Sequence, residues 1–288
     1  MPVRPQPAVM VPAVALFALF VLSGCGGASA PATPAGYSGA SARPANAFVF
    51  YDGGPVLVAP KLYIVFWGYK RYGDPDKVAP LLISYAQNMG GSPHNNIYTQ
   101  YYEEVGSKKI YITNPKSQYG GSWYDDSAVP SNPTDQQVAA EALRSVAHFK
   151  YDPNGLYMVA SPPKRATVGF GTNWCAYHSY TYYQKTNLVP YDNFPYMPDA
   201  PGNDCGKNLI KPPSDETGTD EGVTIMAGHE VGEAVTDPQP YTGWKGESGE
   251  VGDYCAWHNI KNIAFGTKSY TTQPMLSNAT NTCVQKYK

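Results

Sequence analysis

The sequence predicts a mixed α/β domain, stabilised by disulfides, that follows an export signal and a linker. Strand-like apolar runs alternate with amphipathic helical segments, which is typical of α/β architectures. Four cysteines lie in the second half of the chain, and a low-complexity stretch precedes the first strand-like run. We therefore divide the chain into a signal peptide at 1–24, a tether at 25–47 and a single domain at 48–288.

The amino terminus has the composition of a lipoprotein signal peptide. Arg4 precedes an apolar run at 9–22, which is short for a membrane span and suits a secretory signal. Leu-Ser-Gly before Cys25 resembles a bacterial lipobox, which implies cleavage before Cys25 and lipidation of its sulfur. The alternative is an ordinary signal peptide cleaved near 28–30. We expect an exported protein anchored through lipid to the cell envelope, at the outer membrane or the cell surface.

Composition supports export and argues against one class of partner. Residues 26–47 are rich in Gly, Ala, Ser and Pro and bury too little apolar surface to fold, so they form a flexible tether. Charged residues make up 15% of the chain and the net charge is −2, so we expect no nucleic-acid partner.

The elements of the domain follow from periodicity and side-chain shape. Runs rich in β-branched and aromatic residues predict strands, and apolar residues spaced three or four apart predict helices. Strands are expected at 56–67 with a break at Pro60, at 109–113 and at 156–161, and helices at 76–89, 97–102 and 134–149. Thr134 can cap the last of these helices.

Two further segments complete the domain. The tyrosine-rich stretch 169–206 predicts short strands and a long surface loop that would line a substrate cleft. A helix is expected to begin near Thr219 or Asp220 and to end at Asp237, because the residue before Pro238 disfavours helical backbone. The glycines in this helix are expected where neighbours pack tightly on both sides.

Cysteine usage is consistent with an exported domain. Beyond Cys25 the chain has an even number of cysteines, which predicts two disulfides. Three pairings are possible, and the simplest joins neighbours in the sequence: Cys175 with Cys205, and Cys255 with Cys283. The alternative is four free buried thiols.

The sequence HEVGE at 229–233 is the strongest chemical signal in the chain. It differs from the zinc-protease motif H-E-x-x-H in having Glu233 at the second ligand position. On a helix His229 and Glu233 share one face and can share one metal ion. Glu230 corresponds to the general base of H-E-x-x-H enzymes, which takes a proton from a metal-bound water. The alternative is a buried structural histidine.

A zinc site needs at least one more protein ligand. Glu250, Asp253 and His178 are the candidates, and the spacing does not choose among them. The set His229, Glu233 and His178 matches zinc peptidase chemistry, whereas two carboxylates with one histidine would make a less Lewis-acidic ion. Asp237 lies one turn further along the same face, where a helix-end role suits it better. We expect Zn²⁺, with another divalent metal as the alternative.

Three motifs resemble one family of secreted proteins. The stretches GHEVGEAVTDP, GW and GEVGDYC, with Cys175-Ala-Tyr-His178 upstream, resemble the EXORDIUM-like, or phosphate-induced, proteins, and the ending EAVTDP is closer to their bacterial branch. The resemblance implies an extracellular protein in which one site gathers the residues His178, His229, Glu230, Glu233, Glu250 and Asp253. It implies no particular substrate.

These observations predict a zinc-dependent hydrolase of zincin-like architecture, in which a mixed sheet packs on the His229 helix. We expect it to act on peptide bonds or another cell-envelope substrate, with Glu230 as the base and Tyr177 or His258 stabilising the oxyanion. The alternative is a non-enzymatic surface protein whose metal is structural and whose aromatic surface binds glycan or a partner. A third possibility is a metal-free domain held by disulfides.

Overall fold

The computed structural model describes residues 48–210 and 214–288. The signal peptide, the tether and the lipidation site at Cys25 lie outside these residues, so they stay predictions, as does the domain boundary at residue 48. No helix in the described part of the chain is long and apolar enough to cross a membrane.

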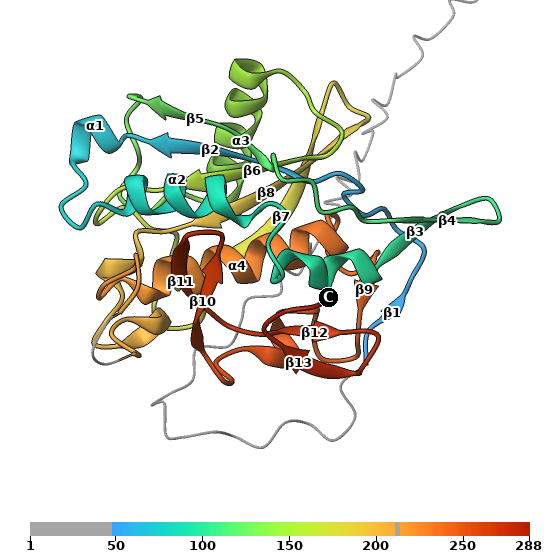
Figure 1. The fold of residues 1–288 in the computed structure, drawn as a ribbon. Coiled ribbons are helices and arrows are strands. Elements are labelled where there is room, and N and C mark those ends of the chain that lie inside the picture. The colour runs from blue at the N-terminus through green and yellow to red at the C-terminus, as the bar shows by residue number, and fades with distance from the viewer. Residues whose placement is uncertain (1–47, 211–213) are drawn as a thin grey trace, which may run out of the picture.

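A five-stranded sheet forms the centre of the molecule (Figure 1). Its strands, in spatial order, are β5 (Tyr119–Asp125), β2 (Lys61–Trp67), β6 (Gly155–Ala160), β8 (Asn187–Phe194) and β7 (Tyr177–Tyr183). The first four run parallel, and β7 pairs antiparallel with β8 at one edge. The predicted mixed α/β class is confirmed.

Helices cover both faces of this sheet (Figure 1). Helix α3 (Asp135–Phe149) packs on one face, whereas α2 (Val78–Met89) and α4 (Glu221–Thr236) lie on the other. Alternation along β2 supplies both cores: Leu62, Ile64 and Phe66 join the α2 and α4 side, and Tyr63, Val65 and Trp67 join the α3 side. The predicted cap of α3 is confirmed, because Thr134 and Gln137 form a capping box.

Short elements surround this core. They are the strand pairs β1 (Phe50–Tyr51) with β9 (Trp244–Lys245), β3 (Tyr102–Val105) with β4 (Lys108–Tyr111), β10 (Lys261–Phe265) with β11 (Lys268–Thr272), and β12 (Met275–Ser277) with β13 (Thr282–Val284). The short helices are α1 (Tyr69–Tyr72), η1 (Asn95–Gln100), η2 (Met197–Asp199), η3 (Asp204–Gly206) and η4 (Asp253–Cys255). The carboxyl terminus ends beside η1, where Asn96 donates to the backbone oxygen of Lys288 (Figure 1).

Three sequence predictions need correction. Strand β5 was not expected, because Gly120 and Gly121 obscure its pattern. The stretch 169–206 was expected to be short strands and loop, yet β7 and β8 have 7 and 8 residues and belong to the central sheet. The helix expected at 97–102 is a 3₁₀ helix that begins two residues earlier.

Both predicted disulfides are confirmed. Cys175 is bonded to Cys205, and Cys255 is bonded to Cys283. The first joins the segment before β7 to η3, and the second joins η4 to β13. The alternative of free thiols is wrong.

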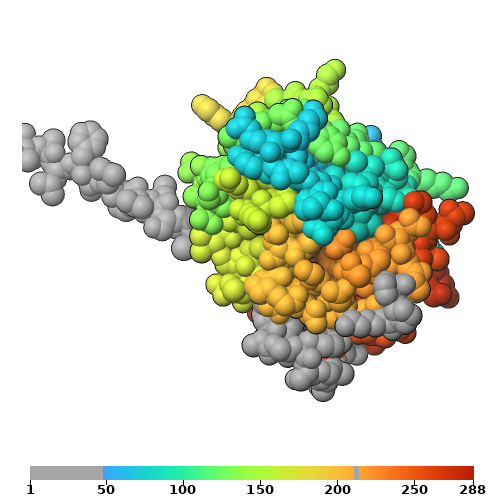
Figure 2. All heavy atoms as spheres, turned by 90° about the vertical axis from the view of Figure 1, so that its left-hand side faces the viewer, coloured from blue at the N-terminus to red at the C-terminus, as the bar shows by residue number. Residues whose placement is uncertain are grey.

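Helix α4 is buried along its whole length, on every face. Figure 2 shows how segments far apart in the chain close over one side of the molecule, where α2 in cyan lies against later segments in yellow and orange. The glycines of α4 allow this packing, as expected. A Cβ at Gly232 would lie 2.7 Å from the hydroxyl oxygen of Tyr98, and one at Gly228 would lie 3.0 Å from that of Tyr85.

Candidate metal centre

Helix α4 carries three of the predicted site residues, His229, Glu230 and Glu233, and all three are fully buried. The helix ends at Asp237, as predicted. The carboxylate of Asp237 accepts the backbone N–H groups of Tyr241 and Gly243, both at 2.7 Å, and so holds the chain that leaves the helix. Asp237 therefore serves as a helix-end anchor, the role expected from its place before proline.

The edge strand β7 brings His178 to this helix. His178 pairs directly with Asp192 on β8, so both side chains lie on the sheet face that packs on α4. Tyr177 precedes His178 and therefore points to the opposite face. Its hydroxyl donates to Asp135 of α3 at 2.9 Å. This geometry removes Tyr177 from the site as an oxyanion donor.

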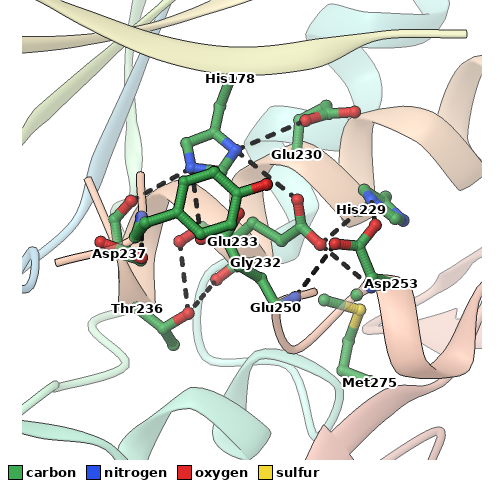
Figure 3. A network of polar contacts seen from close by, with 12 residues as sticks. His178, His229, Glu230, Gly232, Glu233, Thr236, Asp237, Glu250, Asp253 and Met275 are labelled. Carbon is green, nitrogen blue, oxygen red and sulfur yellow. Dashed lines mark hydrogen bonds and ion pairs between the residues drawn. The ribbon is translucent and has the colours of Figure 1, made fainter. Parts of the chain in front are cut away.

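His178 lies among three glutamates (Figure 3). Its Nδ1 is 3.7 Å from Glu230 Oε2 and 3.6 Å from Glu233 Oε2. Its Nε2 is 3.1 Å from the backbone oxygen of Asp237 and 3.6 Å from Glu250 Oε1. When the ring is neutral, as a metal ligand must be, a hydrogen bond from Nε2 to that carbonyl leaves Nδ1 without a proton and directed at Glu230 and Glu233.

His229 is held in a similar way on the other side of Glu233. Its Nε2 is 3.2 Å from Glu233 Oε1 and 3.7 Å from Asp253 Oδ1. Its Nδ1 is 2.9 Å from the side-chain amide of Gln273, which also bonds the backbone oxygen of Gly252. The outer nitrogen of each histidine is thus fixed by a partner, and the inner nitrogen is directed at Glu233.

The loop after β9 closes over the helix. The backbone N–H of Asp253 donates to Glu233 Oε1 at 3.0 Å, and that of Glu250 donates to Asp253 Oδ2 at 3.0 Å. A Cβ at Gly252 would lie 2.9 Å from Glu233 Oε1, so only glycine lets the loop approach this closely. The neighbouring Cys255 fixes the loop to β13 through its disulfide.

Two overlapping groups of side chains could each hold a metal ion. One is His178, Glu233 and Glu250, and the other is His229, Glu233 and Asp253. Among the described residues no such group contains both histidines, so the predicted set of His178, His229 and Glu233 is not assembled around one point.

The buried atoms of this cluster fit a cation. His178 Nδ1, His229 Nε2, Glu233 Oε2 and both carboxylate oxygens of Glu230 are buried and have no hydrogen-bond partner within residues 48–210 and 214–288. Buried polar atoms in native proteins are almost always satisfied, and buried carboxylates are paired or bind metal. The residue types, imidazole and carboxylate, are those that zinc prefers.

The pKa shifts of the cluster also indicate a site that suits a cation. Burial raises the pKa of the Asp253 carboxyl to about 7, and the charge of Glu233 adds to this shift. Burial alone would lower the pKa of His229, but Glu233 and its acidic neighbours outweigh it and raise that pKa to about 10. Burial also raises the pKa of Asp192 well above its usual range, with Glu230 adding to it. The cluster therefore attracts positive charge.

The six residues that the family resemblance implied do gather in one place. His258 is partly exposed and belongs to neither group of potential ligands. Sequence reasoning missed Asp192 and Gln273. Asp192 is the only charged residue of β8, which was the available signal for it, whereas nothing in the sequence marked Gln273.

Comparison with known proteins supports a single relationship. No family model and no solved structure matches the chain. The chain is 26% identical over 233 residues to "Protein EXORDIUM-like 5" of Arabidopsis thaliana. The match covers 71% of this chain, which spans 63% of the length of that relative. The similarity supports the resemblance to EXORDIUM-like proteins inferred from the sequence, and the closer likeness to their bacterial branch stays a prediction.

Proposed function

We propose that this chain is an exported, zinc-dependent hydrolase of zincin-like architecture that acts on peptide bonds at the cell envelope. The observation that carries the proposal is Glu230, a fully buried carboxylate whose two oxygens have no hydrogen-bond partner. It stands beside His229 in the sequence and 3.7 Å from His178 Nδ1. Burying such a group costs free energy, and a functional role would account for that cost.

The arrangement of helix and sheet supports the zincin-like part of the proposal. The helix with the H-E-x-x-E sequence packs against a mixed sheet, and the edge strand of that sheet supplies another histidine. His229 and Glu233 are one helical turn apart and would hold the metal, with Asp253 completing the ligand set; the alternative set is His178, Glu233 and Glu250.

In the proposed reaction the metal ion and the side chains would have different roles. Bound zinc supplies Lewis acidity and lowers the pKa of a coordinated water to about 7. Glu230 would accept the proton from that water, and its unpartnered oxygens leave room for this. The carbonyl of Asp237 would keep the His178 ring in place by accepting from its Nε2–H. Gln273 contacts His229 Nδ1 through its amide nitrogen, so binding of a metal at Nε2 would require Gln273 to turn its amide oxygen to Nδ1–H.

Export is supported by the two disulfides, which persist in oxidising compartments. Lipidation at Cys25 would then hold the domain at the membrane surface. Under this proposal the substrate is a peptide or another cell-envelope polymer.

Burial favours a second candidate function, a non-enzymatic surface protein with a structural metal site. The side chains of His178, His229, Glu230, Glu233 and Glu250 are fully buried, and that of Asp253 is 14% exposed. A sealed ion would clamp α4 to the Glu250 loop, and a glycan or protein partner would bind elsewhere. The hydrolase instead requires that the loop bearing Asp253 moves aside to admit a substrate.

Changing Glu230 to glutamine separates the two functions. A general base contributes about 10²–10⁴-fold to turnover, so Glu230→Gln should lose at least 100-fold in peptide hydrolysis while keeping its zinc. The measurement pairs metal content by mass spectrometry with cleavage of a fluorogenic peptide library. Glu247→Gln, an exposed glutamate near the same loop, is the matched control and should change neither. Hydrolysis that survives Glu230→Gln unchanged would rule out this mechanism.

A further inference from the structure

The carboxylate of Glu233 lies between two separate sets of potential ligands. Its Oε2 is directed at His178, whose Nδ1 is 3.6 Å away, and its Oε1 is directed at His229, whose Nε2 is 3.2 Å away. Glu250 belongs to the first set and Asp253 to the second. Each oxygen of one carboxylate thus faces its own histidine and its own second carboxylate.

These separations suit ligands of a shared ion better than they suit hydrogen bonds. Two ligand atoms bound about 2.1 Å from one zinc at a tetrahedral angle lie roughly 3.4 Å apart. The separations between the inner histidine nitrogens and the oxygens of Glu233 and Asp253 run from 3.2 to 3.7 Å, and Glu250 has an oxygen within 4.8 Å of the ligand atoms of His178 and Glu233. His178 Nδ1 and His229 Nε2 are fully buried and have no hydrogen-bond partner.

Charge balance also calls for more than one cation. Glu230, Glu233, Glu250 and Asp253 contact the two histidines within one cluster. Histidines that bind a metal are neutral, so one divalent ion then balances two carboxylates, whereas two ions balance four. Because an uncompensated buried carboxylate is costly, the second ion removes a penalty that the first leaves in place.

We propose that the centre is dinuclear: Glu233 bridges two divalent cations, one held by His178 and Glu250 and the other by His229 and Asp253. This inference rests on the metal site of the proposed function. It adds a second ion and assigns His178 and Asp253 to different halves. In paired-metal hydrolases two ions act together on the attacking and leaving oxygens, so the substrate class would widen from peptides to esters of phosphate.

Metal stoichiometry of the purified full chain tests the inference. After saturation with Zn²⁺ and removal of excess metal, the wild type should retain two zinc ions per chain. His178→Gln and Asp253→Ala should each retain one, because each removes a ligand from one half only. Glu233→Gln should retain fewer than one. His258→Ala, which changes a histidine outside both groups, should still retain two.

A spectroscopic readout guards against variants that bind metal nonspecifically. Two Co²⁺ ions joined by one carboxylate couple magnetically, so the wild type should give a weaker electron paramagnetic resonance signal per cobalt than His178→Gln or Asp253→Ala. Circular dichroism identifies any variant that fails to fold, and Asp253→Asn then replaces Asp253→Ala. One zinc in the wild type would overturn the dinuclear centre but leave the proposed hydrolase standing. No zinc in the folded wild type would overturn both.

Discussion

At the scale of single residues, a buried acidic side chain can be explained by its neighbours in one case and left without a neutralising partner in another. Glu141 on α3 is a useful contrast to the metal centre, since it is buried beside Asp125 while Arg144 covers the pair. Burial raises the pKa of the Glu141 carboxyl to about 8, and its hydrogen bond to Asp125 adds to the shift. At neutral pH this glutamate is therefore protonated and donates to its neighbour.

Glu141 should make stability depend on pH in a defined direction. A carboxyl whose pKa is higher in the folded state binds more protons there than in the unfolded chain, so the free energy of unfolding falls as pH rises through the window from about 4.5 to about 8. Glu141→Gln keeps a hydrogen-bond donor without a charge. We expect it to gain roughly 3–4 kcal/mol relative to wild type between pH 5 and pH 8.

Urea denaturation of both proteins at pH 5, 6.5 and 8 measures this difference at one fixed zinc concentration. Asp126→Asn changes an exposed aspartate paired with Lys70 and serves as the control, with an expected change below about 0.5 kcal/mol at every pH. Parallel pH profiles for wild type and Glu141→Gln would contradict the buried, protonated state of Glu141.

At the scale of elements, α4 shows how packing overrides intrinsic preference. Gly228 and Gly232 each cost about 1 kcal/mol of helix propensity relative to alanine. The structure explains their presence, because a side chain at Gly232 would meet Tyr98 and Met275, whereas one at Gly228 would touch only Tyr85. The two positions therefore form a matched pair that differs in available space.

Gly232→Ala should lower the free energy of unfolding by about 1–3 kcal/mol, since overpacking exceeds the gain in propensity. The free energy of unfolding of Gly228→Ala should lie within about 1 kcal/mol of the wild-type value. The new methyl group would make a close but tolerable contact with Tyr85, and alanine has the higher helix propensity. Urea midpoints with unchanged slopes would measure both values. Equal effects at the two sites would show that local packing does not select these glycines.

The same scale shows what the sequence could and could not predict. Helix α3 was predicted well because Thr134 caps it and its apolar stripe is regular. The cysteine pairing followed from proximity along the chain. The length of β7 and β8 and their place in the central sheet were not predicted, because these strands carry polar groups on both faces. Tyr177 and Tyr191 reach Asp135, while His178 and Asp192 face α4. Alternation of apolar and polar residues is hidden in such a strand.

The sequence predicted which residues meet at the site, but not that they form two sets of potential metal ligands. The sequence motifs identified all six side chains that meet at α4, since a helix fixes the relation of His229 to Glu233. They could not show that His178 and His229 approach opposite oxygens of Glu233, because that depends on how β7 and the Asp253 loop dock on the helix. Distances across the fold are set by packing, which no local spacing encodes.

At the scale of the whole molecule, the proposed metal centre joins three parts of the chain that are distant in sequence. The edge strand contributes His178, the helix His229 and Glu233, and the disulfide-bound loop Glu250 and Asp253. An ion at their junction should stabilise the entire domain, because it binds the folded state and finds no assembled site in the unfolded chain.

Removal of metal should consequently lower the melting temperature. Zinc at about 100 times its dissociation constant contributes roughly 2.7 kcal/mol, which corresponds to about 5–10 °C for a domain of this size. Scanning fluorimetry of the wild type with a chelator, and again after zinc is restored, measures the shift. Glu233→Gln, which changes the carboxylate common to both groups of potential ligands, should melt at nearly one temperature under both conditions, and His258→Ala should behave as wild type. Both the hydrolase and the structural metal site require that zinc binding stabilises the folded domain. A wild type whose melting temperature changes with neither chelator nor zinc would therefore contradict both proposed functions.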